Sequence, residues 1–130
     1  MPTLAGLAGL AWLYDAHVVW AYVAIAANAV AGLILLVTWR VPRWRGRWMW
    51  VPTIGAQAAM MLQVVIGVVL VASDQYVAPR FHMFYGFVAF ITVGIAYSYR
   101  RQMRGRRELF YGLVGLFIMG LGIRAILQAG

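Results

Sequence analysis

Long apolar runs separated by short polar segments make up most of this chain. Four of these runs cover residues 17–39, 49–72, 82–99 and 109–128. Each is close to the ~20 residues that an α-helix needs to cross ~30 Å of hydrocarbon. The pattern therefore predicts four transmembrane helices. Because short connections make neighbouring helices antiparallel, we expect an all-α, integral membrane, up-down four-helix bundle.

The composition agrees with a protein whose solvent is the lipid bilayer. The chain has 130 residues, of which 65% are hydrophobic and only 11% are charged. A water-soluble domain of this length could not bury so much apolar surface, because its surface-to-volume ratio is too high. The chain has no cysteine, which excludes disulfides and thiolate metal sites.

The positive charge is concentrated in two short segments between apolar runs. All 11 basic residues are arginines, and most of them lie within residues 40–47 and 100–107. Tryptophans alternate with the arginines of the first segment. Short arginine-rich loops stay in the cytoplasm and tryptophans settle at the headgroup level. We therefore expect a multi-pass protein of the cell membrane, with both loops cytoplasmic and both termini outside. Membrane anchoring explains the net charge of +8, and no nucleic-acid partner is expected.

Residues 1–14 are apolar but carry no basic side chain ahead of the apolar stretch, which argues against a cleavable signal peptide. They form either an interfacial helix or an outward extension of the first span. Within the spans, small residues favour close helix contacts and amides favour hydrogen bonds between helices. The amide side chains are those of Asn28, Gln57 and Gln63. In the alternative interpretation, they bind the carbonyl of a quinone. The glycines expected at helix contacts in the fourth span are Gly112, Gly115, Gly120 and Gly122.

The only two histidines begin two similar stretches. His17-Val-Val-Trp-Ala-Tyr-Val-Ala24 and His82-Met-Phe-Tyr-Gly-Phe-Val-Ala89 match in pattern after a shift of 65 positions. The match predicts two parallel two-helix repeats, related by an axis along the membrane normal. Such an axis brings both imidazoles to a similar depth near the outer face, where they can face each other. Chance similarity between apolar helices is the competing explanation.

Small residues follow each histidine on the same helical face. Positions four and seven residues later are Ala21 and Ala24 in the first copy, and Gly86 and Ala89 in the second. A flat macrocycle held between two helices needs such clearance. The same residues would also suit an ordinary close contact between helices.

A few charged residues are expected near the histidines at the outer end. Arg124 either pairs with Asp15 or Asp74, or binds a cofactor carboxylate such as a heme propionate. Arg80 and Asp15 stand before their histidines at corresponding places and could pair across the repeat axis.

With His17, His82 and the small residues one turn later, the chain resembles small membrane cytochromes of the b type. It is similar in layout to cytochrome b561-like bundles and to the four-helix halves of the heme A synthase family. The resemblance implies heme held between histidines of facing helices. The cytochrome b561 family typically uses two histidine pairs, whereas this chain has one. We also find no counterpart of the carboxylate associated with heme A synthase chemistry.

The leading hypothesis is a membrane protein with one bis-histidine heme b near the outer face. His17 and His82 are the expected metal ligands, and Ala21, Gly86, Arg80 and Arg124 are expected around the cofactor. Two imidazole ligands leave no open iron position, which favours electron transfer over oxygen chemistry. A single heme near one face implies a quinone or a partner redox protein.

Two other hypotheses remain. In the first, the chain is a cofactor-free accessory subunit of a larger membrane complex, and its glycine-rich spans are helix contacts. A homo-oligomer is also expected as a possible assembly. Alternatively, the histidines bind copper or zinc together with Asp15, Asp74 or Met83. No P-loop, HExxH or nucleophile elbow is present, so no catalytic residues are assigned. The sequence thus favours an electron carrier or a subunit over a stand-alone enzyme.

Overall fold

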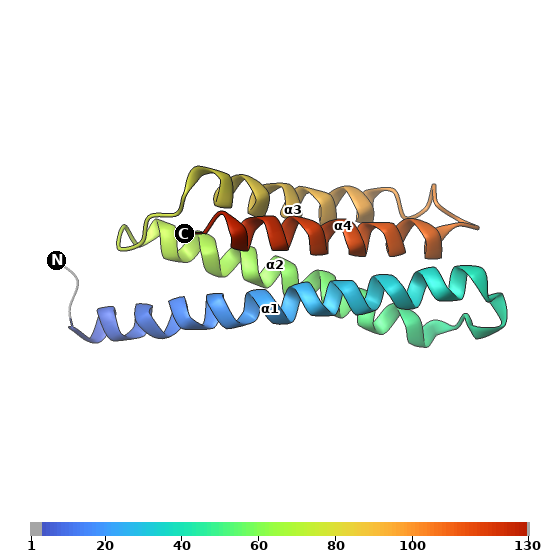
Figure 1. Ribbon diagram of the computed structural model, residues 1–130, viewed down its shortest axis with the longest axis horizontal. Coiled ribbons are helices and arrows are strands. Elements are labelled where there is room, and N and C mark those ends of the chain that lie inside the picture. The colour runs from blue at the N-terminus through green and yellow to red at the C-terminus, as the bar shows by residue number, and fades with distance from the viewer. Residues whose placement is uncertain (1–3, 130) are drawn as a thin grey trace.

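The computed structural model describes residues 4–129, with side chains from Leu10 onward, and is all-helical (Figure 1). Two short 3₁₀ turns, η1 and η2, connect the first two of its four long helices. The elements are α1 (Leu4–Arg40), η1 (Pro42–Trp44), η2 (Arg47–Met49), α2 (Trp50–Ala72), α3 (Arg80–Ser98) and α4 (Arg107–Leu127). The helices cover the four apolar runs, so the predicted all-α, four-helix class is confirmed.

Helix α1 is much longer than the first apolar run. It is continuous from Leu4 and protrudes beyond the other three helices (Figure 1). Its 37 residues correspond to ~55 Å at ~1.5 Å per residue, which exceeds the ~30 Å hydrocarbon core. Two arrangements were expected for residues 1–14, a separate interfacial helix or an extension of the first span. The structure shows the second for residues 4–14, which continue α1 without a break. Residues 1–3 lie outside the described part of the chain.

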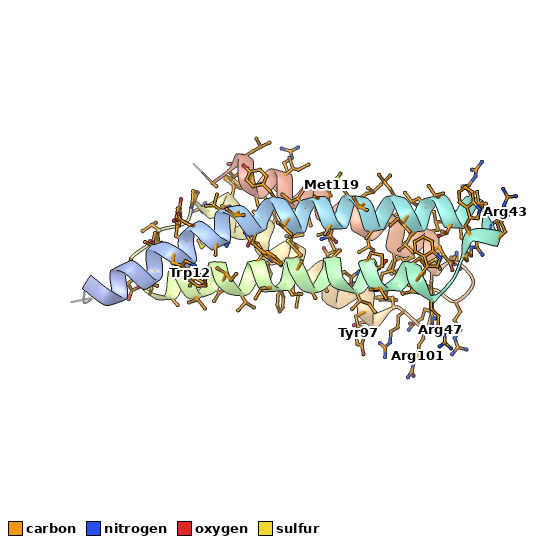
Figure 2. The ribbon with its side chains drawn as sticks, turned by 90° about the horizontal axis from the view of Figure 1, so that it is seen from below. Trp12, Arg43, Arg47, Tyr97, Arg101 and Met119 are labelled. Carbon is orange, nitrogen blue, oxygen red and sulfur yellow. The ribbon has the colours of Figure 1, made fainter. Side chains whose placement is uncertain are left out.

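The surface of the bundle is largely apolar. All four helices are long and apolar enough to cross a membrane. Large side chains stand exposed along them, with 70% of Trp12 and 74% of Val51 accessible. Water-soluble monomers rarely expose continuous apolar surface on this scale, whereas a lipid bilayer accommodates it. Arg43, Arg47 and Arg101 lie at one end of the bundle, so both arginine-rich segments share that end (Figure 2).

The four helices form a ring in which α1 and α3 are diagonal to each other. Helix α1 packs against α4 and α2, and α3 packs mainly against α4. No Cα atom of α1 comes within 8 Å of one in α3 among the described residues. The seam between α2 and α3 is the loosest of the four. Two side chains that meet across the α1–α3 diagonal therefore meet inside the bundle.

Glycines make the tight seam between α1 and α4. A Cβ atom on Gly115 would lie 3.0 Å from the carbonyl oxygen of Asn28, and one on Gly112 would lie 2.8 Å from the Leu36 side chain. Gly122 is similarly close to Ile25. The predicted contacts of these three glycines are confirmed. The prediction for Gly120 is wrong, because a Cβ atom there would meet nothing within 4 Å.

The packing departs from two-fold symmetry. Parallel two-helix repeats would make the α1–α4 and α3–α2 seams equivalent, but only the first is close-packed. The glycines available to the second seam, Gly55 on α2 and Gly86 and Gly94 on α3, face open space. The duplication stays a prediction, and any such symmetry does not extend to the helix contacts.

Candidate functional site

The rings of His17 and His82 meet across the α1–α3 diagonal. Their centroids are 6.1 Å apart and their planes are inclined at 81°. Both side chains are half-buried. Helices α1 and α3 have no Cα atoms within 8 Å of each other, so these two side chains bridge the interior of the bundle. The structure thus brings together the only two histidines of the sequence.

A backbone carbonyl orients the His82 ring. Nδ1 of His82 lies 2.7 Å from the carbonyl oxygen of Ala125, on the neighbouring helix α4. A carbonyl oxygen can only accept, so Nδ1 must carry the proton and donate it. In the neutral ring Nε2 then holds the free lone pair. Metal-binding histidines commonly have this arrangement, in which the second ring nitrogen donates to a carbonyl.

Two residues of helix α2, Gly67 and Gln63, contact His17. A Cβ atom on Gly67 would lie only 3.1 Å from Cε1 of His17, so the ring occupies space that a larger residue would take. Nε2 of Gln63 donates to the backbone carbonyl of His17 at 2.6 Å. Nδ1 of His17 and Oε1 of Gln63 are both buried without a hydrogen-bond partner. Two polar atoms next to the histidine pair are therefore available to a ligand.

The hydrogen bonds predicted for the amides are present for Asn28 and Gln63. Nδ2 of Asn28 donates to the carbonyl oxygens of Ala24 (2.8 Å) and Ala56 (3.1 Å), joining α1 to α2. Sequence analysis did not identify Gln63 and Gly67 as neighbours of His17. The sequence around Gln63 and Gly67 gives no sign of this contact. Their distance from His17 depends on how α2 is aligned along α1.

The space below the histidines is filled. Ala24 and Ala89 are buried together in one cluster whose other members are Met60, Ile118 and Leu121. The expected clearance at these two alanines is therefore wrong, since α2 and α4 supply the bulk that α1 and α3 lack. Ala21 and Gly86, one turn from the histidines, are half-buried, and a Cβ atom on Gly86 would meet nothing within 4 Å. Gly86 therefore faces open space, as Gly55 and Gly94 do.

The charged residues expected near the histidines do not form the expected pairs. Arg80 begins α3 and is exposed, as are Asp15 and Asp74. Arg124 lines a groove of about 420 Å³ together with Tyr85, Phe117 and Gly120. Across residues 10–129, no ion pair joins these two arginines to Asp15 or Asp74. Both arginines therefore remain free to bind an anionic group.

A three-ligand metal site is not assembled in the described residues. They contain no group of three or more His, Cys, Asp or Glu side chains that could hold an ion. Asp15 and Asp74 therefore do not join the histidines in such a group, and the copper or zinc hypothesis with Met83 as the further ligand stays a prediction.

Comparisons with protein-family models, curated proteins and solved structures find no match to this chain. The function is therefore argued from the geometry of the bundle.

Proposed function

We propose that this protein is a multi-pass membrane protein that binds one b-type heme, with His17 and His82 as axial ligands. The observation that carries the proposal is the approach of the two rings to 6.1 Å across the bundle diagonal. Charged or polar side chains inside membrane helices are costly and are usually functional. The two histidines meet from helices that have no Cα atoms within 8 Å of each other, and a shared ligand would explain why both are placed there.

The separation of the rings fits ligands on opposite sides of one metal. With metal–nitrogen bonds of about 2.0–2.1 Å and ring nitrogens about 1.1 Å from the ring centre, opposed imidazoles have centroids about 6.3 Å apart. Ligands at a tetrahedral angle would bring the centroids to about 5 Å. The observed 6.1 Å is compatible with opposed ligands of one metal, and with planes inclined at 81° it is equally an ordinary edge-to-face contact of two rings.

The residues around the pair have separate roles in this proposal. The carbonyl of Ala125 fixes the tautomer of His82 and leaves the Nε2 lone pair free for a ligand. Gly67 and Gln63 hold His17 from the α2 side. Gly86 presents no side chain one turn after His82, and Arg80 and Arg124 would be available to the propionates. When bound, heme would supply a one-electron redox centre at this place.

The redox partner acts at the end of the bundle that holds the histidines. His17 is ~35 Å along α1 from Arg40, at ~1.5 Å per residue. A single heme at that depth cannot carry electrons across the ~30 Å hydrocarbon core by itself. We therefore propose a quinone or a redox protein as electron donor or acceptor. With the arginine-rich loops in the cytoplasm, the site lies toward the outer face of the cell membrane.

A second candidate function is that of a cofactor-free accessory subunit. It is favoured by the surface of α3, where Phe81, Phe84 and Phe87 are 58%, 55% and 62% exposed. A partner subunit would cover this aromatic face, and the filled core at Ala24 and Ala89 needs no cofactor.

Absorption spectra of the purified protein test the proposal. Wild type expressed with ample heme is expected to show a Soret band that shifts on reduction. His17→Ala and His82→Ala should each lose bis-histidine ligation, while Gln57→Ala, a half-buried change elsewhere on α2, should not. Helical circular dichroism and elution as a single species establish that each variant is folded. Folded wild type without a Soret band after heme reconstitution would overturn the heme proposal and favour the subunit.

A further inference from the structure

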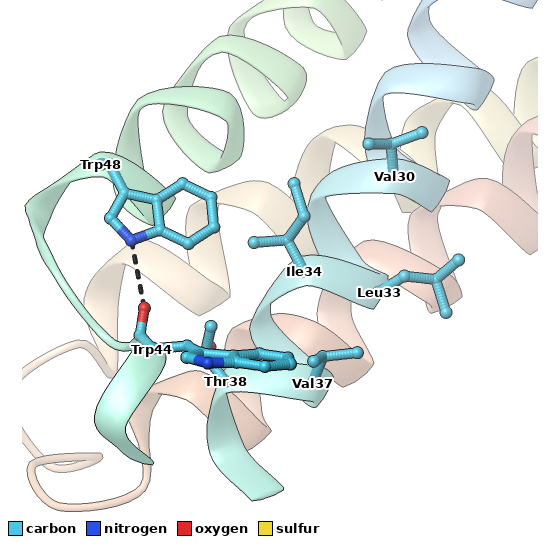
Figure 3. A pocket seen from close by; sticks show the side chains of 7 residues that line it. All are labelled: Val30, Leu33, Ile34, Val37, Thr38, Trp44 and Trp48. Atoms are coloured by element: carbon cyan, nitrogen blue, oxygen red, sulfur yellow. Dashed lines mark hydrogen bonds between the residues drawn. The ribbon is translucent and has the colours of Figure 1, made fainter. Parts of the chain in front are cut away.

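An apolar groove of about 530 Å³ lies at the arginine-rich end of the bundle, far from the histidines (Figure 3). Helix α1 forms its floor, and the tryptophans of η1 and η2 form its walls. The lining residues are Val30, Leu33, Ile34, Val37, Thr38, Trp44 and Trp48. The one polar member, Thr38, donates its hydroxyl to the carbonyl of Leu35 at 3.0 Å. The volume is within the range of small-molecule sites, and the lining suits a hydrocarbon chain.

The tryptophan walls are held in place by hydrogen bonds of the loop. Nε1 of Trp48 donates to the carbonyl of Trp44 at 3.1 Å (Figure 3). The Arg45 guanidinium donates to the carbonyls of Thr38 and Trp39, each at 2.8 Å, and so fastens the loop to the end of α1. The groove therefore exists before any ligand binds.

Two exposed arginines directly precede the tryptophans of the walls, Arg43 before Trp44 and Arg47 before Trp48. Arg43 and Arg47 are exposed, and the Arg43 guanidinium lies 5.7 Å from the centroid of the Trp44 ring. Figure 2 shows both arginines at this end of the bundle. Arg45 differs from them, because its donors are used by backbone carbonyls. An apolar groove whose wall tryptophans each follow an exposed arginine is complementary to an amphiphile with an anionic head.

We propose that this groove binds an anionic phospholipid. One acyl chain lies along α1 between Trp44 and Trp48, and the phosphate headgroup binds Arg43 and Arg47. A helix of a partner protein is a poorer occupant. Helix contacts in membranes favour small residues, whereas this groove is lined by branched aliphatic side chains and indoles. The proposal does not depend on heme binding.

Native mass spectrometry in detergent, with phosphatidylglycerol and phosphatidylcholine as probes, tests the headgroup contact. Two arginines predict roughly 30-fold tighter binding of phosphatidylglycerol. Arg43→Gln/Arg47→Gln should remove this preference. Arg101→Gln/Arg104→Gln removes the same charge from the other loop at the same end and should keep it. Equal binding of the two lipids by wild type, or an equal loss in both double variants, overturns the proposal.

A second pair of variants tests the groove itself. Leu33 and Leu113 are both 54% exposed, but only Leu33 lines the groove. Leu33→Trp should fill the groove and reduce phosphatidylglycerol binding at least tenfold, and Leu113→Trp should leave it unchanged. If Leu33→Trp instead alters the oligomeric state and leaves lipid binding intact, the groove is a protein contact and the proposal is wrong.

Discussion

The His17 ring rests directly against the backbone of Gly67, across the seam between α1 and α2. A Cβ atom on Gly67 would lie 3.1 Å from Cε1, 3.7 Å from Nε2 and 3.8 Å from Nδ1 of His17. One glycine on α2 therefore controls the position of a ring on α1 that meets the His82 ring on α3. This contact makes the geometry of the histidine pair depend on a third helix.

Gly67→Val should displace His17 from His82. The added methyl groups overlap the ring, and overpacking of this kind costs about 1–3 kcal/mol. We expect the variant to bind heme at least tenfold more weakly than wild type, measured by titration of the Soret band. Gly55→Val on the same helix is the control, because its Cβ atom meets nothing within 4 Å. Equal heme affinity of wild type and Gly67→Val would show that Gly67 does not position the ring.

Gly115→Leu should open the seam between α1 and α4. A Cβ atom on Gly115 would lie 3.0 Å from backbone atoms of Asn28 and Gly32, which cannot yield as a flexible side chain would. We expect a loss of about 3 kcal/mol or more in the free energy of unfolding in mixed micelles. Gly120→Leu lies on the same helix but points into a groove, where a Cβ atom would meet nothing within 4 Å. This variant should therefore be tolerated. Similar losses in the two variants would contradict the assigned seam.

Asn28→Ala should weaken the contact between α1 and α2. The Asn28 side chain is buried and donates to carbonyls of both helices. Hydrogen bonds between membrane helices contribute about 0.6 kcal/mol on average and up to about 1.7 kcal/mol. We expect a loss of about 1–2 kcal/mol, which includes the small cavity left by the amide. Gln57→Ala on α2 serves as control, and an unchanged stability of Asn28→Ala would show that the bond contributes nothing.

Tyr111→Phe should weaken the contact between α3 and α4 without changing its shape. The Tyr111 hydroxyl donates to the carbonyl of Ala96 at 2.8 Å in a buried position. Its removal is expected to cost about 0.5–1.5 kcal/mol. Tyr97→Phe, at an exposed position of α3, should cost less. The free energy of unfolding of both variants in the same micelles measures the difference. Equal losses would show that the hydrogen bond of Tyr111 adds no stability.

The glycines illustrate how far the sequence could predict the fold. Gly112, Gly115, Gly120 and Gly122 were all expected at a helix contact, and three of them are. Gly120 lies on the opposite side of α4, beside Arg124. The composition of a helix indicates that it packs closely, but the direction of each residue depends on how the helix is rotated against its neighbours.

The surroundings of the histidines illustrate the same limit. Ala24 and Ala89 are small, as the sequence says, yet Met60, Ile118 and Leu121 fill the space beside them. These three side chains come from α2 and α4, which the spacing along α1 and α3 does not describe. Gln63 and Gly67 were missed as neighbours of His17 for the same reason.

The sequence by itself determined the four apolar helices, their order and the grouping of arginines in two loops. Those properties depend on the length, hydropathy and charge of consecutive residues, which can be read along the chain. Only the tertiary structure decided that α1 and α3 are diagonal, that their histidines meet at 6.1 Å and that Gly67 supports one of them. The physical reason is that the rotation and alignment of each helix are fixed by side chains of helices distant in the sequence.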